Sequence, residues 1–383
     1  MPKRIVLCFD GTWNAPAEKF VGLKALHDRV KALCDAGGKP AVLQALEALD
    51  PGPDAVETNV CRFYRSIVVR QLEKDGAGPV GQVRWYDAGV GTNWYDRVAG
   101  GAFGLGLSQN LREGYQFLAE TYEPGDSIFI LGFSRGAYTA RSLVGMIRNS
   151  GLLPAGGTGD GPQSAPMMEA YEIYRTRDRD ADSERALAFR KLHGCRMVEI
   201  TFLGVWDTVG ALGIPIESFA GFNRSAFEFH DTELSGIVRN AFHAIAVDEH
   251  REPYAVTLWD PIRKLDQRVE QRWFVGAHCD VGGGYQDRGL SDVTLAWMQH
   301  RAMECGLELH PRAVPAVGEQ QALGALTDSF ANFLEGLFRL FSRRFYRPVR
   351  RAQFGQEQVD ETVHLRLKRD VAYRPKNPGL FDG

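Results

Sequence analysis

One strand–turn–helix signature stands out in the sequence, Ser127-Ile128-Phe129-Ile130-Leu131-Gly132-Phe133-Ser134-Arg135-Gly136-Ala137-Tyr138. An apolar, β-branched run stops at a serine that has a glycine two positions before it and another two positions after it, and a helical pattern follows. In such a turn the serine backbone is strained, and neighbouring backbone comes so close that only glycine fits on either side. The signature predicts a nucleophile elbow that exposes the Ser134 hydroxyl at the carboxyl edge of a sheet. A structural Ser-Gly turn is the alternative.

Length and composition restrict the class of protein. The chain has 383 residues, a net charge of −3 and 44% hydrophobic residues, which is enough for a large globular core. No overall basic field is present, so we expect no nucleic-acid partner. The chain begins almost directly with an apolar strand-like run and has no apolar run of ~18 residues. We therefore expect synthesis in the cytoplasm, without a signal peptide or a transmembrane anchor.

Cysteine and histidine patterns bear on metal binding. The six cysteines are scattered singly, and the nine histidines form no H-E-x-x-H motif. We expect a reducing compartment of synthesis, no metal and no cofactor.

Strands and helices alternate along the chain. The pattern predicts strands over 4–9, 83–86, 197–205 and 272–277, besides the strand that leads to Ser134. Helical patterns cover 59–72 and 135–149, and residues 111–122 have helical spacing. This alternation indicates a largely parallel sheet with functional groups at the carboxyl ends of the strands. We expect one α/β domain over 1–383, with a helical cap built from the insertions 151–195 and 310–351.

Three polar residues follow apolar strands in the order that α/β-hydrolases use for a catalytic triad: nucleophile, acid, histidine. They are Ser134, Asp207 and His278. A serine nucleophile needs a base within hydrogen-bond reach, and a histidine base needs a carboxylate that fixes its tautomer and stabilises the imidazolium. Asp207 could instead cap the following helix, in which case Asp248 or Asp280 would be the acid.

Two other histidines compete with His278 for the role of base. His243 lies within Val238–Ala246, which reads as a helix or a buried segment and favours a structural histidine. His250 lies in a charge cluster that is either solvated or a structural ion-pair network. Only His278 combines a strand end with a flexible glycine loop that could admit a substrate.

An oxyanion hole needs two N–H donors beside the nucleophile. The backbone N–H of Arg135, directly after Ser134, is the first candidate. The second is the N–H of Gly11 or Thr12 after the first strand, in a loop that Asp10 would order. An ordinary Asx turn at Asp10 is the alternative.

Several motifs together extend beyond the triad, and they lie at Ile5–Asn14, Tyr86–Thr92, Gly132–Arg141, Gly204–Gly210 and Trp273–Tyr285. Jointly and in this order they resemble the DUF2235 family of α/β-hydrolases, which includes the Tle1-like phospholipase effectors of type VI secretion. The resemblance implies an α/β-hydrolase fold and a triad at Ser134, Asp207 and His278. For effector members it also implies phospholipid hydrolysis of the phospholipase A type, export by the secretion system and a partner within it.

Other functions remain open. A small-molecule carboxylesterase would use the same triad. A non-catalytic nucleotide-binding module could be read from Gly101, Gly104 and Gly106, but the third fingerprint glycine is missing. A haloacid-dehalogenase-like phosphohydrolase could be read from Phe9–Thr12, but Cys8 stands where that chemistry needs an aspartate.

The region Phe330–Arg351 combines aromatic and basic residues. Apolar residues recur at helical spacing, with arginines among them, at Phe330, Phe333, Leu334, Leu337, Arg339, Phe341, Arg343, Arg344, Phe345 and Arg347. Such a face suits an interfacial helix that contacts a membrane peripherally. The same pattern fits a lid, or a helix that packs on its own protein.

Overall fold

The fold is taken from a computed structural model, which describes residues 2–11, 56–70, 80–89, 103–159, 161–176, 181–209, 233–260, 266–332, 339, 342–349 and 357–381. Within these ranges seven strands form one sheet, and every neighbouring pair is parallel. The strand order is β2-β1-β3-β4-β5-β6-β7. The strands are β1 (Arg4–Phe9), β2 (Gln82–Asp87), β3 (Ser127–Phe133), β4 (Ile200–Trp206), β5 (Val238–Ala246), β6 (Arg268–Phe274) and β7 (Glu357–Val359). The fold is the expected α/β fold, with a mostly parallel sheet flanked by helices.

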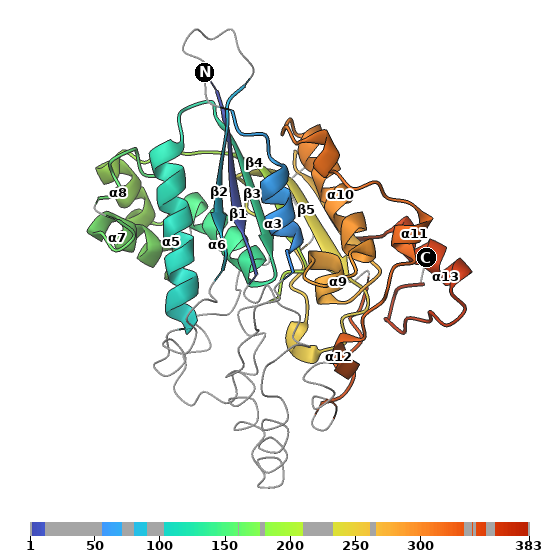
Figure 1. The fold of residues 1–383 in the computed structure, drawn as a ribbon. Helices are drawn as coiled ribbons and strands as arrows, with labels where there is room; N and C mark the ends of the chain where they lie inside the picture. Colours follow the sequence, from blue (N-terminus) through green and yellow to red (C-terminus); the bar gives the residue numbers. More distant parts are fainter. Residues whose placement is uncertain are drawn as a thin grey trace, which may run out of the picture.

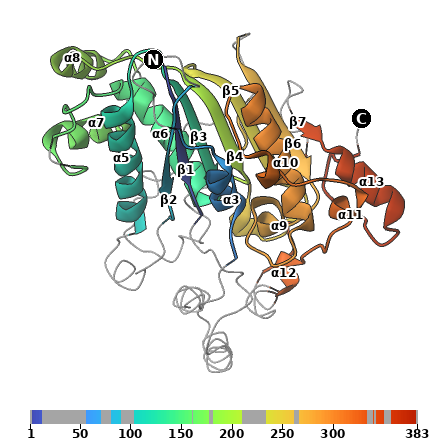
Figure 2. The same ribbon diagram turned by 45° about the horizontal axis from the view of Figure 1, so that its top comes forward.

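Helices cover both faces of the sheet (Figure 1). They are α3 (Asn59–Ser66), α5 (Phe103–Thr121), α6 (Arg135–Ser150), α7 (Ala165–Arg175), α8 (Glu184–His193), α9 (His278–Gly282), α10 (Gly289–Glu304), α11 (Glu319–Ala322), α12 (Ser329–Asn332) and α13 (Glu361–Arg369), with 3-10 turns η3 (Glu252–Tyr254) and η4 (Pro311–Ala313). Figure 2 shows the same elements from another side, with α13 and the C-terminus beyond β7 at one end of the sheet.

The alternation of side chains along β1 explains the two layers. Ile5 and Leu7 point into a core shared with α5, α6, α7 and α8. Val6 and Cys8 point into a second core shared with α3 and α10. Because successive side chains of a strand face opposite sides, a strand that is apolar at every position must be covered on both faces. The run that precedes Ser134 is such a strand.

The turn from β3 into α6 has the geometry of the expected nucleophile elbow. Ser134 has a φ of 56° and a ψ of −118° and lies directly before the first residue of α6. A Cβ on Gly132 would lie 2.5 Å from the Gly136 carbonyl oxygen, and one on Gly136 would lie 2.1 Å from the Phe9 carbonyl oxygen. Backbone packing therefore requires both flanking glycines.

We expect Gly136→Ala to lower the free energy of unfolding by about 3 kcal/mol or more, because its Cβ would collide with backbone rather than with a movable side chain. Gly318→Ala is the matched control, since a Cβ there would meet only the Gln321 side chain, at 3.7 Å. Chemical unfolding of both variants measures the difference. Equal stability of the two variants would contradict this account of the elbow.

Some boundaries differ from the sequence-based expectation. The helix expected over 59–72 ends at Ser66, because Ile67 is extended and bridges to Leu309. Residues 238–246, for which a helix was one interpretation, form the buried strand β5. His278 begins the short helix α9 and is not part of a flexible loop. The strand β7 was not expected.

The two expected cap insertions have different surroundings. In 151–195, α7 and α8 pack against α6, and buried residues of both helices belong to the core on that side of the sheet. In 310–351, the prediction that helical structure continues through Phe345 and Arg347 is wrong, because residues 342–349 are not helical. A proline disfavours helical backbone at the residue before it, and Arg347 directly precedes Pro348. The cap roles themselves stay predictions.

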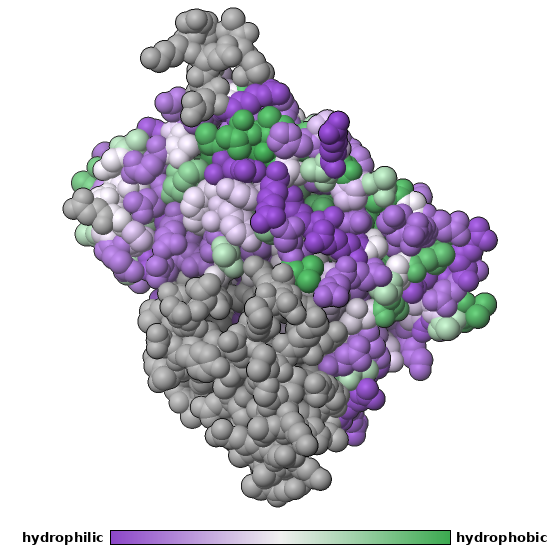
Figure 3. Space-filling model, in the orientation of Figure 1, coloured by the Kyte–Doolittle hydropathy of each residue, from purple (hydrophilic) through white to green (hydrophobic). Residues whose placement is uncertain are grey.

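The outer surface carries mixed hydropathy. Hydrophilic residues cover most of the described part of the face in Figure 3, with hydrophobic residues in smaller patches between them. In the described part of the chain no helix is both long and apolar enough to cross a bilayer.

Candidate active site

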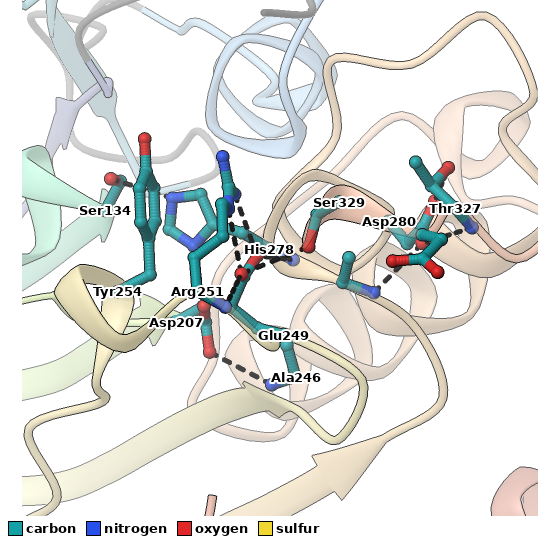
Figure 4. A network of polar contacts seen from close by, with 12 residues as sticks. Ser134, Asp207, Ala246, Glu249, Arg251, Tyr254, His278, Asp280, Thr327 and Ser329 are labelled. Atoms are coloured by element: carbon teal, nitrogen blue, oxygen red, sulfur yellow. Dashed lines mark hydrogen bonds and ion pairs between the residues drawn. The ribbon is translucent and has the colours of Figure 1, made fainter. Parts of the chain in front are cut away.

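Ser134, His278 and Asp207 lie at the carboxyl edge of the sheet, where hydrogen bonds link Ser134 to His278 and His278 to Asp207 (Figure 4). The His278 Nε2 atom is 2.9 Å from the Ser134 Oγ atom, and His278 Nδ1 is 2.6 Å from an Asp207 carboxylate oxygen. All three residues are buried. This is the geometry that a serine nucleophile, its base and an orienting acid require.

The register between β3 and β4 brings Ser134 and Asp207 together. Phe133 and Trp206 are paired at the ends of β3 and β4, so Ser134 and Asp207 leave adjacent strands at the same level. The Ser134 N–H donates to the Trp206 carbonyl, and Asp207 in turn has a positive φ of 38°. His278 reaches the pair from α9, which follows β6, and its ring lies against the Phe133 ring.

The Asp207 carboxylate has three groups of donors. Besides His278, it accepts the Ala246 N–H at 3.0 Å and a bidentate pair from the Arg347 guanidinium at 2.6 and 3.0 Å. Burial by itself raises the pKa of Asp207, but Arg347 and His278 reverse this and hold it well below its usual range. Asp207 is therefore ionised at neutral pH.

A second ion pair supports His278 from the backbone side. Glu249 accepts the His278 backbone N–H at 3.2 Å and binds the Arg251 guanidinium through both carboxylate oxygens at 2.8 Å. Burial raises the pKa of Glu249, but Arg251 holds it at about 2. The Arg251 guanidinium lies over the Tyr254 ring, and the Tyr254 and His278 rings meet in a T-shaped arrangement with centroids 5.1 Å apart. Burial lowers the pKa of His278, although Asp207 acts in the opposite direction.

The alternative acids have other partners. The Asp248 carboxylate accepts the Gly276 N–H and the Tyr373 hydroxyl, and that of Asp280 accepts the Ala277 N–H and the N–H and hydroxyl of Thr327. Both carboxylates hold the turn that presents His278.

The alternative histidines also have structural surroundings. His243 is fully buried in β5 and accepts the Thr208 N–H, and burial lowers its pKa to about 3. The His250 ring donates to the Phe345 carbonyl at 3.0 Å. It lies next to the buried Glu249–Arg251 pair, so the charge cluster is an ion-pair network rather than a solvated surface.

Two of the three residues expected to supply oxyanion donors, Arg135 and Gly11, lie next to Ser134. Arg135 is the first residue of α6, so its N–H lies at the helix N-terminus beside the nucleophile. Gly11 is also adjacent, since a Cβ on it would be 3.4 Å from the Ser134 Cβ. Its N–H donates to the Asp10 carboxylate at 2.7 Å. Thr12 lies outside the described residues.

Asp10 fastens the end of β1 to two other elements. Its carboxylate accepts the Thr58 hydroxyl at 2.7 Å and the Tyr86 hydroxyl at 2.5 Å. Burial raises its pKa to about 6, although these hydrogen bonds act in the opposite direction. Asp10 therefore does more than form a local Asx turn, because its hydrogen bonds join β1, β2 and the start of α3.

The sequence pattern gave Arg347 no role at the active site and placed it only among the arginines of an expected amphipathic helix. The side chain is 1% exposed and reaches Asp207 from a segment 140 residues away in sequence. Pro348 was the available signal against a helix at this point. Phe330 is also buried, so it does not face a membrane. Contact through the rest of Phe330–Arg351 stays a prediction, and Phe333, Leu334, Leu337, Phe341, Arg350 and Arg351 lie outside the described residues.

Among the described residues, no group of three or more histidine, cysteine, aspartate or glutamate side chains is arranged to hold a metal ion.

Comparisons with known proteins assign the chain to a family. Residues 3–301 match the model of the type VI secretion phospholipase effector Tle1-like catalytic domain. An uncharacterized protein of Saccharomyces cerevisiae, YEL023C, is 28% identical over 228 residues, which are 54% of this chain and 30% of that protein.

Two solved structures are also similar. The Tle1 effector bound to the VgrG spike of a type 6 secretion system is 21% identical, with a TM-score of 0.43 over 75% of this chain and 52% of the effector. An uncharacterized protein from Pseudomonas aeruginosa is 16% identical, with a TM-score of 0.38 over 89% of this chain and 51% of that one. The chain spans about half the length of these structures and under a third of the yeast protein. Because the family model matches well over half of its residues, the chain belongs to the family of Tle1-like phospholipase effector catalytic domains of type VI secretion.

Proposed function

We propose that this protein is a serine hydrolase that cleaves acyl esters through a covalent acyl-Ser134 intermediate. The observation that carries the proposal is the continuous hydrogen-bonded path from Ser134 Oγ through His278 to the ionised Asp207. A strained, glycine-flanked serine at the start of a helix, within 2.9 Å of a histidine nitrogen, suits nucleophilic catalysis rather than nucleotide binding.

The reaction proceeds in two stages. His278 Nε2 takes the hydroxyl proton as Ser134 Oγ attacks the ester carbonyl, and then gives that proton to the leaving alcohol. His278 next takes a proton from water, which attacks the acyl-enzyme, and returns the proton to Ser134 as the carboxylic acid leaves. Asp207 keeps the proton of the resting imidazole on Nδ1 and stabilises the imidazolium at each stage. The Arg135 N–H would hold the oxyanion together with the Thr12 N–H, because the Gly11 N–H donates to the Asp10 carboxylate.

The substrate class follows from family membership. We propose a phospholipid substrate cleaved in the manner of a phospholipase A, export by a type VI secretion system and a partner within that system. The proposed chemistry uses side chains, backbone N–H groups and water, and the proposal includes no cofactor.

Vesicles of phosphatidylethanolamine and phosphatidylglycerol with different acyl chains at the two glycerol positions test the substrate class. We expect fatty acid and lysophospholipid in a 1:1 ratio, because one ester bond breaks per turnover. Mass spectrometry of the products measures the ratio and the position cleaved. Enzyme inactivated beforehand with a fluorophosphonate is the control.

Other products would change the assignment. Release of diacylglycerol or phosphatidic acid would contradict an acyl-ester reaction. Turnover of short-chain soluble esters, with vesicles left intact, would favour the small-molecule carboxylesterase.

A further inference from the structure

Arg347 makes more contacts at the candidate active site than a surface ion pair would. Its guanidinium binds both oxygens of the Asp207 carboxylate and donates to the backbone carbonyls of Ala246 and Tyr254. Arg347 and Asp207 are 1% and 0% exposed, so this charge pair lies entirely within the protein. A fork of planar N–H groups fixes a carboxylate in orientation as well as in charge.

The segment that carries Arg347 is held on both sides. Toward the triad, the Phe345 N–H donates to the His250 carbonyl, and the His250 ring donates to the Phe345 carbonyl. Toward the C-terminus, the Asn377 amide donates to the Arg347 carbonyl and the Val349 N–H donates to the Pro378 carbonyl. These anchors make residues 342–349 a strap between the loop after β5 and the C-terminal region.

This strap lies outside residues 3–301, the part of the chain that the family model matches. The catalytic acid lies inside that part, at the end of β4. The contact between Arg347 and Asp207 therefore joins the matched catalytic region to a segment downstream of it.

We propose that the strap 342–349 completes the active site, with Arg347 as a positioning residue that orients the Asp207 carboxylate and offsets its charge. This inference rests on the proposed function, because it concerns how the triad of that function is tuned. Arg347 acts through Asp207 and makes no contact with the reacting atoms.

The consequence for the triad is electrostatic. An uncompensated Asp207 carboxylate would bind the imidazolium form of His278 more tightly and keep the base protonated to higher pH. The positive charge of Arg347 weakens the attraction between the Asp207 carboxylate and the His278 imidazolium, so neutral His278 is available as the base at lower pH. Because His278 and Asp207 are coupled, the change belongs to the pair. Among the described residues, the charged and titratable groups near His278 include Asp207, Glu249, Arg251 and Tyr254, with Arg347 behind Asp207; Cys279 and Asp280 lie on the same helix as His278.

The pH dependence of kcat/KM for a soluble nitrophenyl ester tests this role in the full-length chain. For Arg347→Met we expect the acid limb of the profile to move up by about one pH unit, the shift that a neighbouring charge typically produces. Arg347→Lys keeps the charge but not the fork, so we expect an unmoved acid limb and kcat/KM lower by roughly tenfold.

Lys3→Met is the control for loss of a buried ion pair as such. Lys3 precedes β1 and Asp126 precedes β3, so the pair lies at the opposite edge of the sheet from the triad. The Lys3 Nζ atom is 2.6 Å from an Asp126 carboxylate oxygen, and both side chains are largely buried. We expect this variant to lose stability without moving the acid limb.

Three results would overturn the proposal: an unmoved limb in Arg347→Met, an equal movement in Lys3→Met, or wild-type kcat/KM in Arg347→Lys. The last comparison decides the matter where Arg347→Met does not fold. A wild-type chain without esterase activity would contradict the proposed function itself, and fluorophosphonate labelling of Ser134 distinguishes that case.

Discussion

Ser134→Ala is expected to lower kcat for ester hydrolysis by about 10⁶-fold while leaving the fold intact. The only route to an acyl-enzyme in the proposed mechanism is the Ser134 Oγ atom, which lies 2.9 Å from its base. Residual turnover would come from binding and the oxyanion donors alone. Initial rates on a soluble ester, with circular dichroism to verify folding, measure the effect.

Ser134→Gly separates the catalytic role of this residue from its structural one. At a φ of 56° and a ψ of −118°, alanine is as strained as serine, whereas glycine adopts this backbone freely. We expect Ser134→Gly to be as inactive as Ser134→Ala but more stable, by about 1 kcal/mol after the greater unfolded-state entropy of glycine is counted. Activity within tenfold of wild type in either variant would contradict the mechanism. A glycine variant less stable than the alanine variant would contradict the strain.

The fold was largely predictable because its signals are local. A strand covered on both faces is expected to be mostly apolar, and residues 128–133 before Ser134 meet that condition. The short strand β7 was not predictable, because three residues are too few to show a period. For 238–246 the sequence left a helix or a buried segment open, because a buried strand and a buried helix have similar composition; the segment is the strand β5.

The proximity of Ser134, Asp207 and His278 was predictable from the sequence, and the residues around them were not. Ser134 and Asp207 directly follow the apolar strands β3 and β4, and His278 follows β6, so their meeting at one edge of the sheet follows from parallel topology. The partner of Asp207 comes from 140 residues later, on a strap without regular secondary structure. No periodicity marks such a segment. Arginine is rarely buried without a partner, and here the buried partner of Arg347 is Asp207.

Asp207→Asn is expected to lower kcat by about 10⁴-fold and the free energy of unfolding by about 3–5 kcal/mol. An asparagine amide that accepts from Arg347 must turn its NH₂ group toward His278 Nδ1. The imidazole then carries its proton on Nε2 and cannot accept the hydroxyl proton of Ser134. The stability loss has a separate cause, because Arg347 would remain buried without its carboxylate.

The double variant Asp207→Asn/Arg347→Met distinguishes these two causes. Removing both charges leaves no buried unpaired ion, so we expect the double variant to be more stable than the sum of the single losses predicts, by about 2 kcal/mol or more. Its kcat should stay as low as that of Asp207→Asn, since no carboxylate is left to orient His278. Chemical unfolding and single-turnover rates of all four proteins complete the cycle. Additive stability losses would show that Arg347 and Asp207 do not act as a pair, and recovery of kcat in the double variant would remove Asp207 from the proposed mechanism.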